Sequence, residues 1–498
     1  MYASLSFGEI TFYCVTWVSA VFYSVYQLWD ATHFMNPNRY KAYEVGWSIS
    51  VKDDSSDYEW QMWVPFLLFK VPWLVSHFVG AELVRRNNIE LLPVWYVLIS
   101  AIFLLNYVGA FATAVLVMKC ALIYALHLLR SRILLWAVCV TLIIGYNMGD
   151  IVDVLSLERR EHYMMSVCGS WVLLRCIGFC LDALNASTST PRPPMPVEFV
   201  LYLSYCLYLP VLFLGPVIMY SDFQVGLKQT YKRWTFPRIL CALLSLLRYV
   251  FWGLVIDAIL HYLYFNSFVM IPKTVRMGNW ALYGYGYALG QFFMVKYVVV
   301  YGIGSSVARL EQIDAPHNPK CIARVHLYSY MWRHFDQGLY LFLLKYIYLP
   351  CCGHSKHYWN KLFASLMCFV FVYVWHTTHF AILIWTLLNF IGVTLEGLGK
   401  QISASAAYRK WEDSTFSPQG IRRFHALLAT PIFMMSALSN FYFLGSYAIG
   451  QVFVSRLLND AFQHNLYLFS ICYCCCQVSI EVNNWEQRKV LEAKLKSQ

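Results

Sequence analysis

Long apolar stretches with almost no charged side chains recur along the whole chain. Each of the clearest ones is about as long as the roughly 20 residues that an α-helix needs to cross a bilayer. No stretch shows the alternation over about ten residues that is typical of a transmembrane β-strand. The pattern therefore predicts a bundle of membrane-crossing helices, not a β-barrel. The clearest stretches are 91–118, 133–149, 199–221, 362–395 and 426–455.

Several candidate membrane segments are short, polar or interrupted by glycine and proline, so some should re-enter the membrane and not cross it. Irregular backbone is tolerated at membrane depth only where it is buried in protein or lines a cavity. The clearest such segment is 326–350, which carries Arg333, His334, Asp336 and Lys345 among aromatic residues. The candidate segments are 9–28, 61–83, 90–108, 110–129, 133–149, 163–184, 199–220, 239–265, 280–303, 326–350, 362–376, 378–398, 426–447 and 463–480.

Short connections between these segments predict one integral-membrane domain over residues 1–498. The polar stretch 400–423 predicts a short interfacial helix, and the Ser- and Pro-rich stretch 187–196 predicts a flexible loop. The run 10–28 has no Lys or Arg before it and no small-residue cleavage site after it. We therefore expect it to remain as a first membrane helix and not to be removed as a signal peptide.

Composition supports a polytopic membrane protein. Hydrophobic residues make up 59% of the chain and charged residues only 13%, whereas an average soluble domain has about 25% charged residues. The net charge of +11 comes from short basic clusters beside apolar segments, which indicates membrane-flanking anchors and argues against a nucleic-acid partner. The stretch 30–59 is acidic through Asp53, Asp54, Asp57 and Glu59. This asymmetry places it on the lumenal side and the N-terminus in the cytosol.

Most of the sixteen cysteines lie within apolar segments. Cysteine acts there as a small hydrophobic residue, so we predict no disulfide framework. Cys351 and Cys352 follow Pro350 at the end of a predicted helix. They are either S-acylated or two ordinary thiols, and the sequence leaves both readings open.

His376 lies inside the uncharged stretch 362–395, and ionisable groups within a membrane usually have a function. Asp336 precedes it by 40 residues (376 − 336), so the two can meet only if the chain folds back. A carboxylate near an imidazole suits general-base chemistry, because it fixes the tautomer and stabilises the imidazolium. The alternative is a structural hydrogen-bonded pair. A metal site is a weaker hypothesis: His376 and His379 share one face of a continuous helix, but they lack further ligands.

Several strings of this sequence resemble the membrane-bound O-acyltransferase family. Within it the resemblance points to the protein-cysteine N-palmitoyltransferases that act on hedgehog-type signalling proteins. It covers residues 200–450 well, and the first 190 residues match mainly in hydrophobic layout. The strings are YMWRHFDQGL at 330–339, YLP at 348–350, VWH at 374–376, WTLLNFIGVTLE at 385–396, YLPVLFLGPVIMYSDF at 208–223, GQFF at 290–293, NPKC at 318–321, RRFHALLA at 422–429 and LSNFYFLG at 438–445.

The resemblance implies a fold and a site. The fold would have about ten crossing helices plus re-entrant loops around a through-membrane tunnel, with residues 451–498 forming a C-terminal helix and a short cytosolic tail. His376 would be the catalytic residue and Asp336 its acidic counterpart. Trp332, Trp375 and Asn440 would contact the substrate. The residue matching a haem-binding cysteine of the family is Cys321 in the NPKC string, which implies a haem b cofactor.

The implied reaction transfers palmitate from palmitoyl-CoA to the N-terminal cysteine of a secreted hedgehog-type or EGF-like protein, in the membrane of the endoplasmic reticulum or Golgi, among membrane lipids. The CoA phosphates need basic groups at the cytosolic mouth, and Arg333 and Lys345 are the candidates. Where the family usually has glycine after Trp-His, this chain has Thr377 and Thr378. Two β-branched residues there could narrow the acyl slot. A lipid or hydroxyl acceptor, and a non-catalytic scaffold or transporter, stay open as alternatives.

Overall fold

Long apolar helices form the fold. The computed structural model describes residues 2–33, 43–45, 52–147, 153–185, 193–270, 277–353 and 357–497. Within these ranges nine helices are long and apolar enough to cross a membrane, as predicted, because a helix satisfies its own backbone hydrogen bonds in lipid. They are α2 (Tyr58–Asn87), α3 (Leu92–Leu128), α6 (Arg159–Asn185), α9 (Phe236–Tyr262), α10 (Asn279–Leu310), α14 (Tyr358–His376), α15 (Phe380–Ala404), α17 (Pro418–Leu444) and α19 (Phe462–Ser497).

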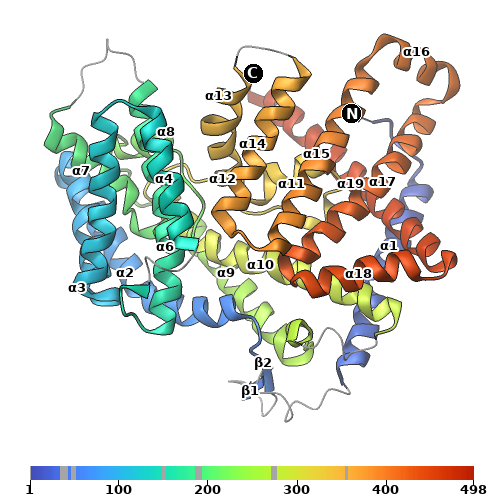
Figure 1. The fold of residues 1–498 in the computed structure, drawn as a ribbon, viewed down its shortest axis with the longest axis horizontal. Helices are drawn as coiled ribbons and strands as arrows, with labels where there is room; N and C mark the ends of the chain where they lie inside the picture. The colour runs from blue at the N-terminus through green and yellow to red at the C-terminus, as the bar shows by residue number, and fades with distance from the viewer. Residues whose placement is uncertain are drawn as a thin grey trace.

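Helix α1 (Phe7–His33) is not one of the nine, but it lies along one side of the molecule (Figure 1). It packs against α10 and α19. A glycine of α10 allows this close approach: a Cβ at Gly284 would lie 2.1 Å from the carbonyl oxygen of Ser24. Small residues let membrane helices approach backbone to backbone. The first predicted membrane segment is therefore a packed part of the bundle.

One prediction about α3 is confirmed. The sequence suggested two segments, 90–108 and 110–129, and α3 consists of two helical stretches that meet at a kink between them. Gly109 has φ 80° and ψ 175° inside this helix. Only glycine adopts such a conformation without steric cost, because it has no Cβ. Two helical stretches therefore meet at Gly109, where the chain changes direction.

The suspected re-entrant segment 326–350 is built from short pieces and is not one long helix. Asp336 separates α11 from α12, and its carboxylate accepts a hydrogen bond from the backbone N–H of Leu339 at 2.9 Å. Such a cap begins a new helix and ends the previous one. The pieces are α11 (Tyr328–Phe335), α12 (Gln337–Leu343), a π-helical turn (Leu344–Tyr348) and α13 (Leu349–Cys352).

Irregular backbone also follows α7 (Met195–Cys206), and two buried cations bind it. Arg175 on α6 donates to the carbonyl oxygens of Cys206, at 3.1 Å, and Val211. Lys70 on α2 donates to the carbonyl oxygen of Pro210 at 3.1 Å. An unsatisfied carbonyl is costly away from water, so these donors stabilise the irregular path.

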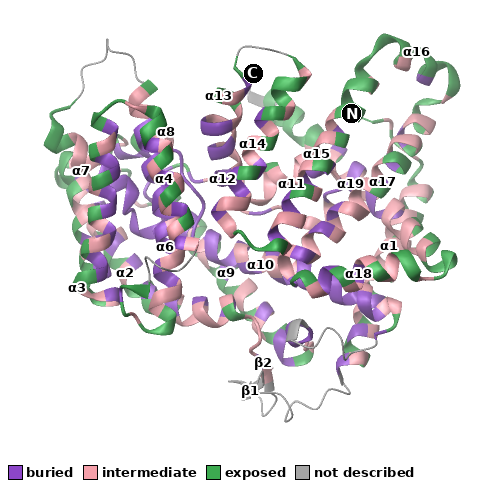
Figure 2. Ribbon diagram, viewed as in Figure 1, coloured by how far each residue is buried: buried purple, intermediate pink, exposed green. Residues whose placement is uncertain are grey.

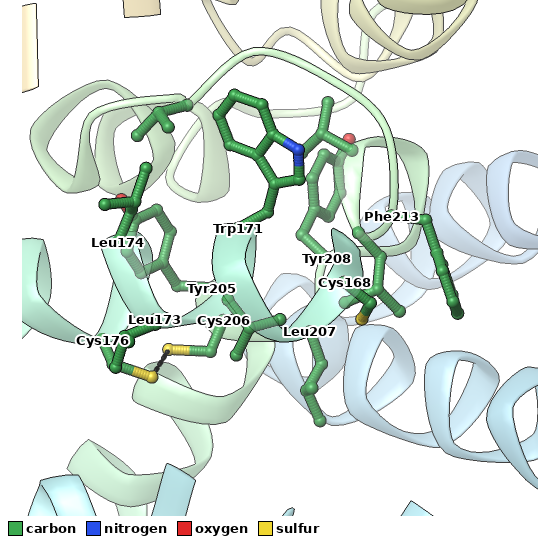
Figure 3. Packing of buried hydrophobic residues seen from close by; sticks show 14 of the residues in the cluster. Cys168, Trp171, Leu173, Leu174, Cys176, Tyr205, Cys206, Leu207, Tyr208 and Phe213 are labelled. Carbon is green, nitrogen blue, oxygen red and sulfur yellow. Dashed lines mark hydrogen bonds between the residues drawn. The ribbon is translucent and has the colours of Figure 1, made fainter. Parts of the chain in front are cut away.

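Apolar side chains pack the same segment against α6. Trp171, Leu173 and Leu174 of α6 lie beside Tyr205 and the residues that follow it (Figure 3). All sixteen cysteines are free thiols in the structure, and many of them are buried.

The two faces of the molecule differ. Both chain ends lie at the edge that also carries α16 (Ala406–Thr415), the expected interfacial helix (Figure 1). The opposite edge carries a small antiparallel ribbon, β1 (Tyr43–Val45) and β2 (Lys52–Asp54), within the acidic stretch (Figure 1). The sequence analysis did not predict this ribbon. The expected loop at 187–196 lies largely outside the described residues.

Burial follows the membrane pattern. Buried residues concentrate between the helices, and exposed ones lie on the outer faces and loops (Figure 2). Helix α9 exposes mostly large apolar side chains, including Leu243, Leu247, Phe251 and Leu254. An outward-facing apolar surface of this kind is suited to lipid. The remaining short helices are α4 (Arg132–Asn147), α8 (Tyr220–Leu227) and α18 (Tyr447–Asn459).

Arg422 on α17 forms hydrogen bonds with segments near both chain ends. Its guanidinium is fully buried and donates to Glu481 at 2.7 Å, to Gln477 and to the carbonyl oxygen of Ala3 at 3.1 Å. These partners lie on α19 and in the N-terminal segment. A buried cation with several acceptors leaves uncompensated groups behind when it is removed.

We predict that Arg422→Ala lowers the free energy of unfolding by about 3–5 kcal/mol. Its neighbour Arg423 provides the matched control, because it pairs with Glu9 at 2.7 Å but its side chain is 45% exposed. An exposed pair contributes only about 0–1 kcal/mol. Melting temperatures of the two purified variants in the same detergent test this prediction, and equal values would contradict it.

Candidate active site

An internal cavity brings together residues that are far apart in the sequence. It is lined by residues of α1, α6, α10, α11, α12, α14, α15, α17, α18 and α19, most of them aromatic or aliphatic. Five of the residues predicted for the site line this cavity. They are Trp332, Asp336, Trp375, His376 and Asn440.

His376 is the last residue of α14, and aromatic rings surround its imidazole. Trp375, Trp385 and Phe443 each meet the imidazole edge to face, with ring centroids 4.8, 5.5 and 5.2 Å away. Among the described residues the imidazole makes no hydrogen bond. Both of its nitrogens are therefore available to a molecule bound in the cavity.

The chain leaves the helix directly after His376, so His379 does not share a helix face with it. Thr377 is extended, with φ −177°, and the hydroxyl of Tyr373 donates to the carbonyl oxygen of Thr378 at 2.8 Å. The predicted i, i+3 pair of histidines is therefore wrong. Within the described ranges no group of three or more His, Cys, Asp or Glu is placed to hold a metal ion. Neither threonine lines the cavity, and both lie where the chain leaves α14.

Asp336 reaches the cavity from the break between α11 and α12. Besides the N–H of Leu339, its carboxylate accepts a hydrogen bond from the hydroxyl of Tyr301 on α10, at 2.9 Å. In the part of the chain that the structure describes, no hydrogen bond joins Asp336 to His376. The two groups line the same cavity, and each is held by different neighbours: Asp336 by hydrogen bonds and His376 by aromatic rings. A reacting molecule can therefore lie between them.

Two indole–amide hydrogen bonds fix the aromatic wall. The Trp332 indole N–H donates to Asn389 at 3.0 Å, and the Trp385 indole N–H donates to Asn440 at 3.1 Å. Asn389 also donates to the backbone oxygen of Trp385 at 2.8 Å. Two tryptophans of the wall are thus held by one connected network. Buried polar networks of this kind hold side chains in one arrangement.

Sequence reasoning missed Tyr301, Trp385 and Asn389 as site residues, although all three line the cavity. The sequence did contain a signal for Asn389. Like His376, it is a polar side chain in the uncharged stretch 362–395, where a polar group needs a hydrogen-bond partner. For Tyr301 there was none, because tyrosines are common along α10 and only packing selects one of them.

The two cations expected to bind CoA do not line the cavity. Lys345 pairs with Asp182 on α6 at 2.7 Å. Arg333 is exposed on α11, with its guanidinium 5.8 Å from the ring centroid of Tyr340. Tyr340 does line the cavity, so Arg333 lies near its edge, whereas Lys345 already has a carboxylate partner.

Cys321 lies beside the cavity, behind its wall. Its thiol is half-buried and has one weak contact, 4.0 Å to the amide oxygen of Gln291, which lines the cavity. Cys321 packs against a small buried cluster that contains Tyr249, Met294 and Val298. A thiol without a strong partner in apolar surroundings fits an axial ligand of haem iron.

The fold and the site define a class: a polytopic helical membrane protein that presents an imidazole and a carboxylate to an apolar internal cavity. The model of "MBOAT, membrane-bound O-acyltransferase family" matches residues 121–439. This chain belongs to the membrane-bound O-acyltransferase family, and the acyltransferase class and fold expected from its sequence are confirmed.

Similar proteins carry more specific names. Over 475 residues the chain is 30% identical to the protein-cysteine N-palmitoyltransferase Rasp of Drosophila melanogaster, covering 93% of this chain and 92% of Rasp. It is 25% identical to the protein-cysteine N-palmitoyltransferase HHAT of Mus musculus, covering 86% and 88% of the two chains. It is also 24% identical to the membrane-bound O-acyltransferase GUP1 of Saccharomyces cerevisiae, covering 81% and 79%.

Proposed function

We propose that this protein transfers palmitate from palmitoyl-CoA to the N-terminal cysteine of a secreted signalling protein of hedgehog or EGF-like type. The observation that supports this most is that His376 and Asp336 line one apolar cavity in a chain similar over most of its length to two protein-cysteine N-palmitoyltransferases. An apolar cavity suits a sixteen-carbon chain, and an acid and a base suit proton transfer.

In the proposed reaction the amine nitrogen of the acceptor attacks the thioester carbonyl of palmitoyl-CoA. His376 removes the proton from the attacking nitrogen and returns it to the departing CoA thiolate. A carbon–nitrogen bond forms and the carbon–sulfur bond breaks. If the cysteine thiol attacks first, the same imidazole takes the thiol proton, and the acyl group then shifts from sulfur to nitrogen.

Asp336 contributes a negative charge that its hydrogen bonds hold in a fixed position. A carboxylate in the same low-dielectric cavity stabilises the imidazolium that forms during proton transfer. Tyr301 and the N–H of Leu339 hold the carboxylate from the side of α10 and α12. The amide-bound tryptophans Trp332 and Trp385 form a fixed apolar wall for the acyl chain.

The test uses purified protein, palmitoyl-CoA and a peptide with an N-terminal cysteine. Mass spectrometry should show a hydroxylamine-resistant palmitoyl amide. A peptide with an acetylated amine should not yield this product, and a peptide that starts with serine should yield it only if the amine attacks directly. Absence of the amide with the cysteine peptide would overturn the proposal.

The similarity to GUP1 supports a second candidate, acyl transfer to a lipid or hydroxyl acceptor. In that case palmitate should appear in the lipid fraction, and the peptide should remain unmodified. Radiolabelled palmitoyl-CoA, followed by separation of lipid and peptide products, distinguishes the two acceptors. The membrane of either candidate would be that of the endoplasmic reticulum or Golgi, and fluorescence microscopy of the tagged full chain tests this.

Haem b is the proposed cofactor, held through the thiolate of Cys321. The chain supplies one sulfur ligand and apolar packing from Tyr249, Met294 and Val298. A bound haem would supply a rigid, flat group for packing and a redox-active iron. We predict a Soret band in the purified protein that is lost in Cys321→Ala and kept in Cys351→Ala. A spectrum without this band in the unaltered protein would contradict the prediction.

A further inference from the structure

A carboxylate of the C-terminal helix lies between two cations at the edge that carries both chain ends. Glu486 on α19 accepts a hydrogen bond from Lys320 at 2.8 Å and forms a salt bridge with Arg324 at 3.0 Å. The hydroxyl of Tyr330 lies 3.4 Å from the same carboxylate. The three donors come from the segment before α11 and from α11 itself. They form an anion site, defined here as Lys320, Arg324 and Tyr330, which Glu486 occupies.

This anion site adjoins the cavity. Arg324 directly follows Ile322 and Ala323, and both of these line the cavity. Tyr330 directly precedes Met331, which also lines it. The donors are therefore one or two residues from the cavity wall, on the side of the molecule where the cytosolic tail is expected.

The site has more donors than one carboxylate uses. The Nε–H of Arg324 is buried and has no hydrogen-bond partner among the described residues. The ammonium of Lys320 has three donors, of which Glu486 and Tyr330 take two. An anion with more oxygens than a carboxylate would satisfy this site better, and phosphate is such an anion.

We propose that Lys320 and Arg324 bind a phosphate group of the acyl-CoA donor and that Glu486 occupies their site until the donor arrives. The inference rests on the proposed function for the identity of the donor. The thioester would lie inside the cavity near His376, while the charged phosphates stay at its edge. The sequence suggested Arg333 and Lys345 as the candidates for binding the CoA phosphates. Lys320 and Arg324 replace them in this proposal, because Asp182 already pairs with Lys345.

The contact with Glu486 also gives the C-terminal helix a role in donor binding. Because the carboxylate and the phosphate compete for the same donors, removing its charge should favour the donor. If the ion pair only stabilised the structure, Glu486→Gln should weaken donor binding, because Lys320 and Arg324 would no longer be held in place. The sign of the effect of Glu486→Gln therefore separates the two explanations.

The experiment measures binding of CoA itself to the purified full chain, by calorimetry, with no acceptor present. We expect Lys320→Gln and Arg324→Gln each to weaken CoA binding by about tenfold or more, as the loss of a charge-assisted hydrogen bond does. Glu486→Gln should strengthen it several-fold. A smaller effect of Lys320→Gln or Arg324→Gln on 3′-dephospho-CoA than on CoA would show that the 3′-phosphate occupies the site, and an equal effect would assign the diphosphate.

Arg488→Gln is the matched control, because Arg488 lies on the same helix but pairs with Glu481 at 2.9 Å. It removes the same charge and should change CoA affinity less than twofold. Unchanged affinity in Lys320→Gln and Arg324→Gln, or weaker binding in Glu486→Gln, would overturn the inference. Failure of the peptide assay together with the expected CoA results would reject the proposed acceptor and leave this site standing.

Discussion

His376→Ala should lower the turnover number for palmitoyl transfer by about 10²-fold to 10⁴-fold, the range for a lost general base. The imidazole is the base of the proposed reaction; His376 lines the cavity, and its ring nitrogens have no hydrogen-bond partner among the described residues. Because the ring packs edge to face against three aromatic residues, its loss also leaves a gap. His376→Gln should be equally inactive while filling more of that gap. The measurement is the initial rate of amide formation at saturating palmitoyl-CoA and peptide.

His379→Ala is the control for this experiment. His379 is three residues further on, exposed, and outside the cavity. We expect its replacement to leave the rate within about twofold, well below the loss of a catalytic group. A large loss in His379→Ala, or full activity in His376→Ala, would contradict the assignment of the base.

Asp336→Asn should lower the turnover number by about 10²-fold, within the range for acid–base groups, with little change in the KM for either substrate. Asparagine can still cap α12 through its side-chain oxygen, so the fold should persist while the negative charge is lost. Circular dichroism and melting temperature check the fold, and initial rates check the activity.

Tyr301→Phe tests how much the position of the Asp336 carboxylate, as distinct from its charge, contributes to the reaction rate. This variant removes the hydroxyl that donates to Asp336 at 2.9 Å and keeps the carboxylate. Loss of a hydrogen bond to a charged group corresponds to about 1.5–3 kcal/mol, so we expect a fall of roughly tenfold or more. If Tyr301 acts through Asp336, the double variant should be no slower than Asp336→Asn alone. Additive losses would show that Tyr301 acts independently.

Much of the fold could be predicted because each membrane helix corresponds to a continuous run of apolar residues in the sequence. The break between 362–376 and 378–398 was found in this way, and His376 stood out as an ionisable group in an uncharged run. Asp336 was found through its motif and polarity. These signals are local, and the structure places both residues on one cavity.

Features that depend on helix packing could not be predicted. Lys345 was expected to face CoA, but its partner Asp182 is 163 residues away in the sequence. Glu486 and Lys320 are 166 residues apart, and nothing in either local pattern indicates the other.

The cations that bind the irregular segment near Val211 also constrain the order of assembly during synthesis. Lys70 leaves the ribosome 140 residues before Pro210, the residue whose carbonyl it binds. Until then, its charge in the membrane costs about 2.5–3.5 kcal/mol near the bilayer centre. Helix α2 is therefore expected to stay near the translocation channel, or in contact with a membrane chaperone, until α6 and the segment after α7 have emerged. Crosslinking of nascent chains that end before and after residue 211 would show when α2 is released into the lipid.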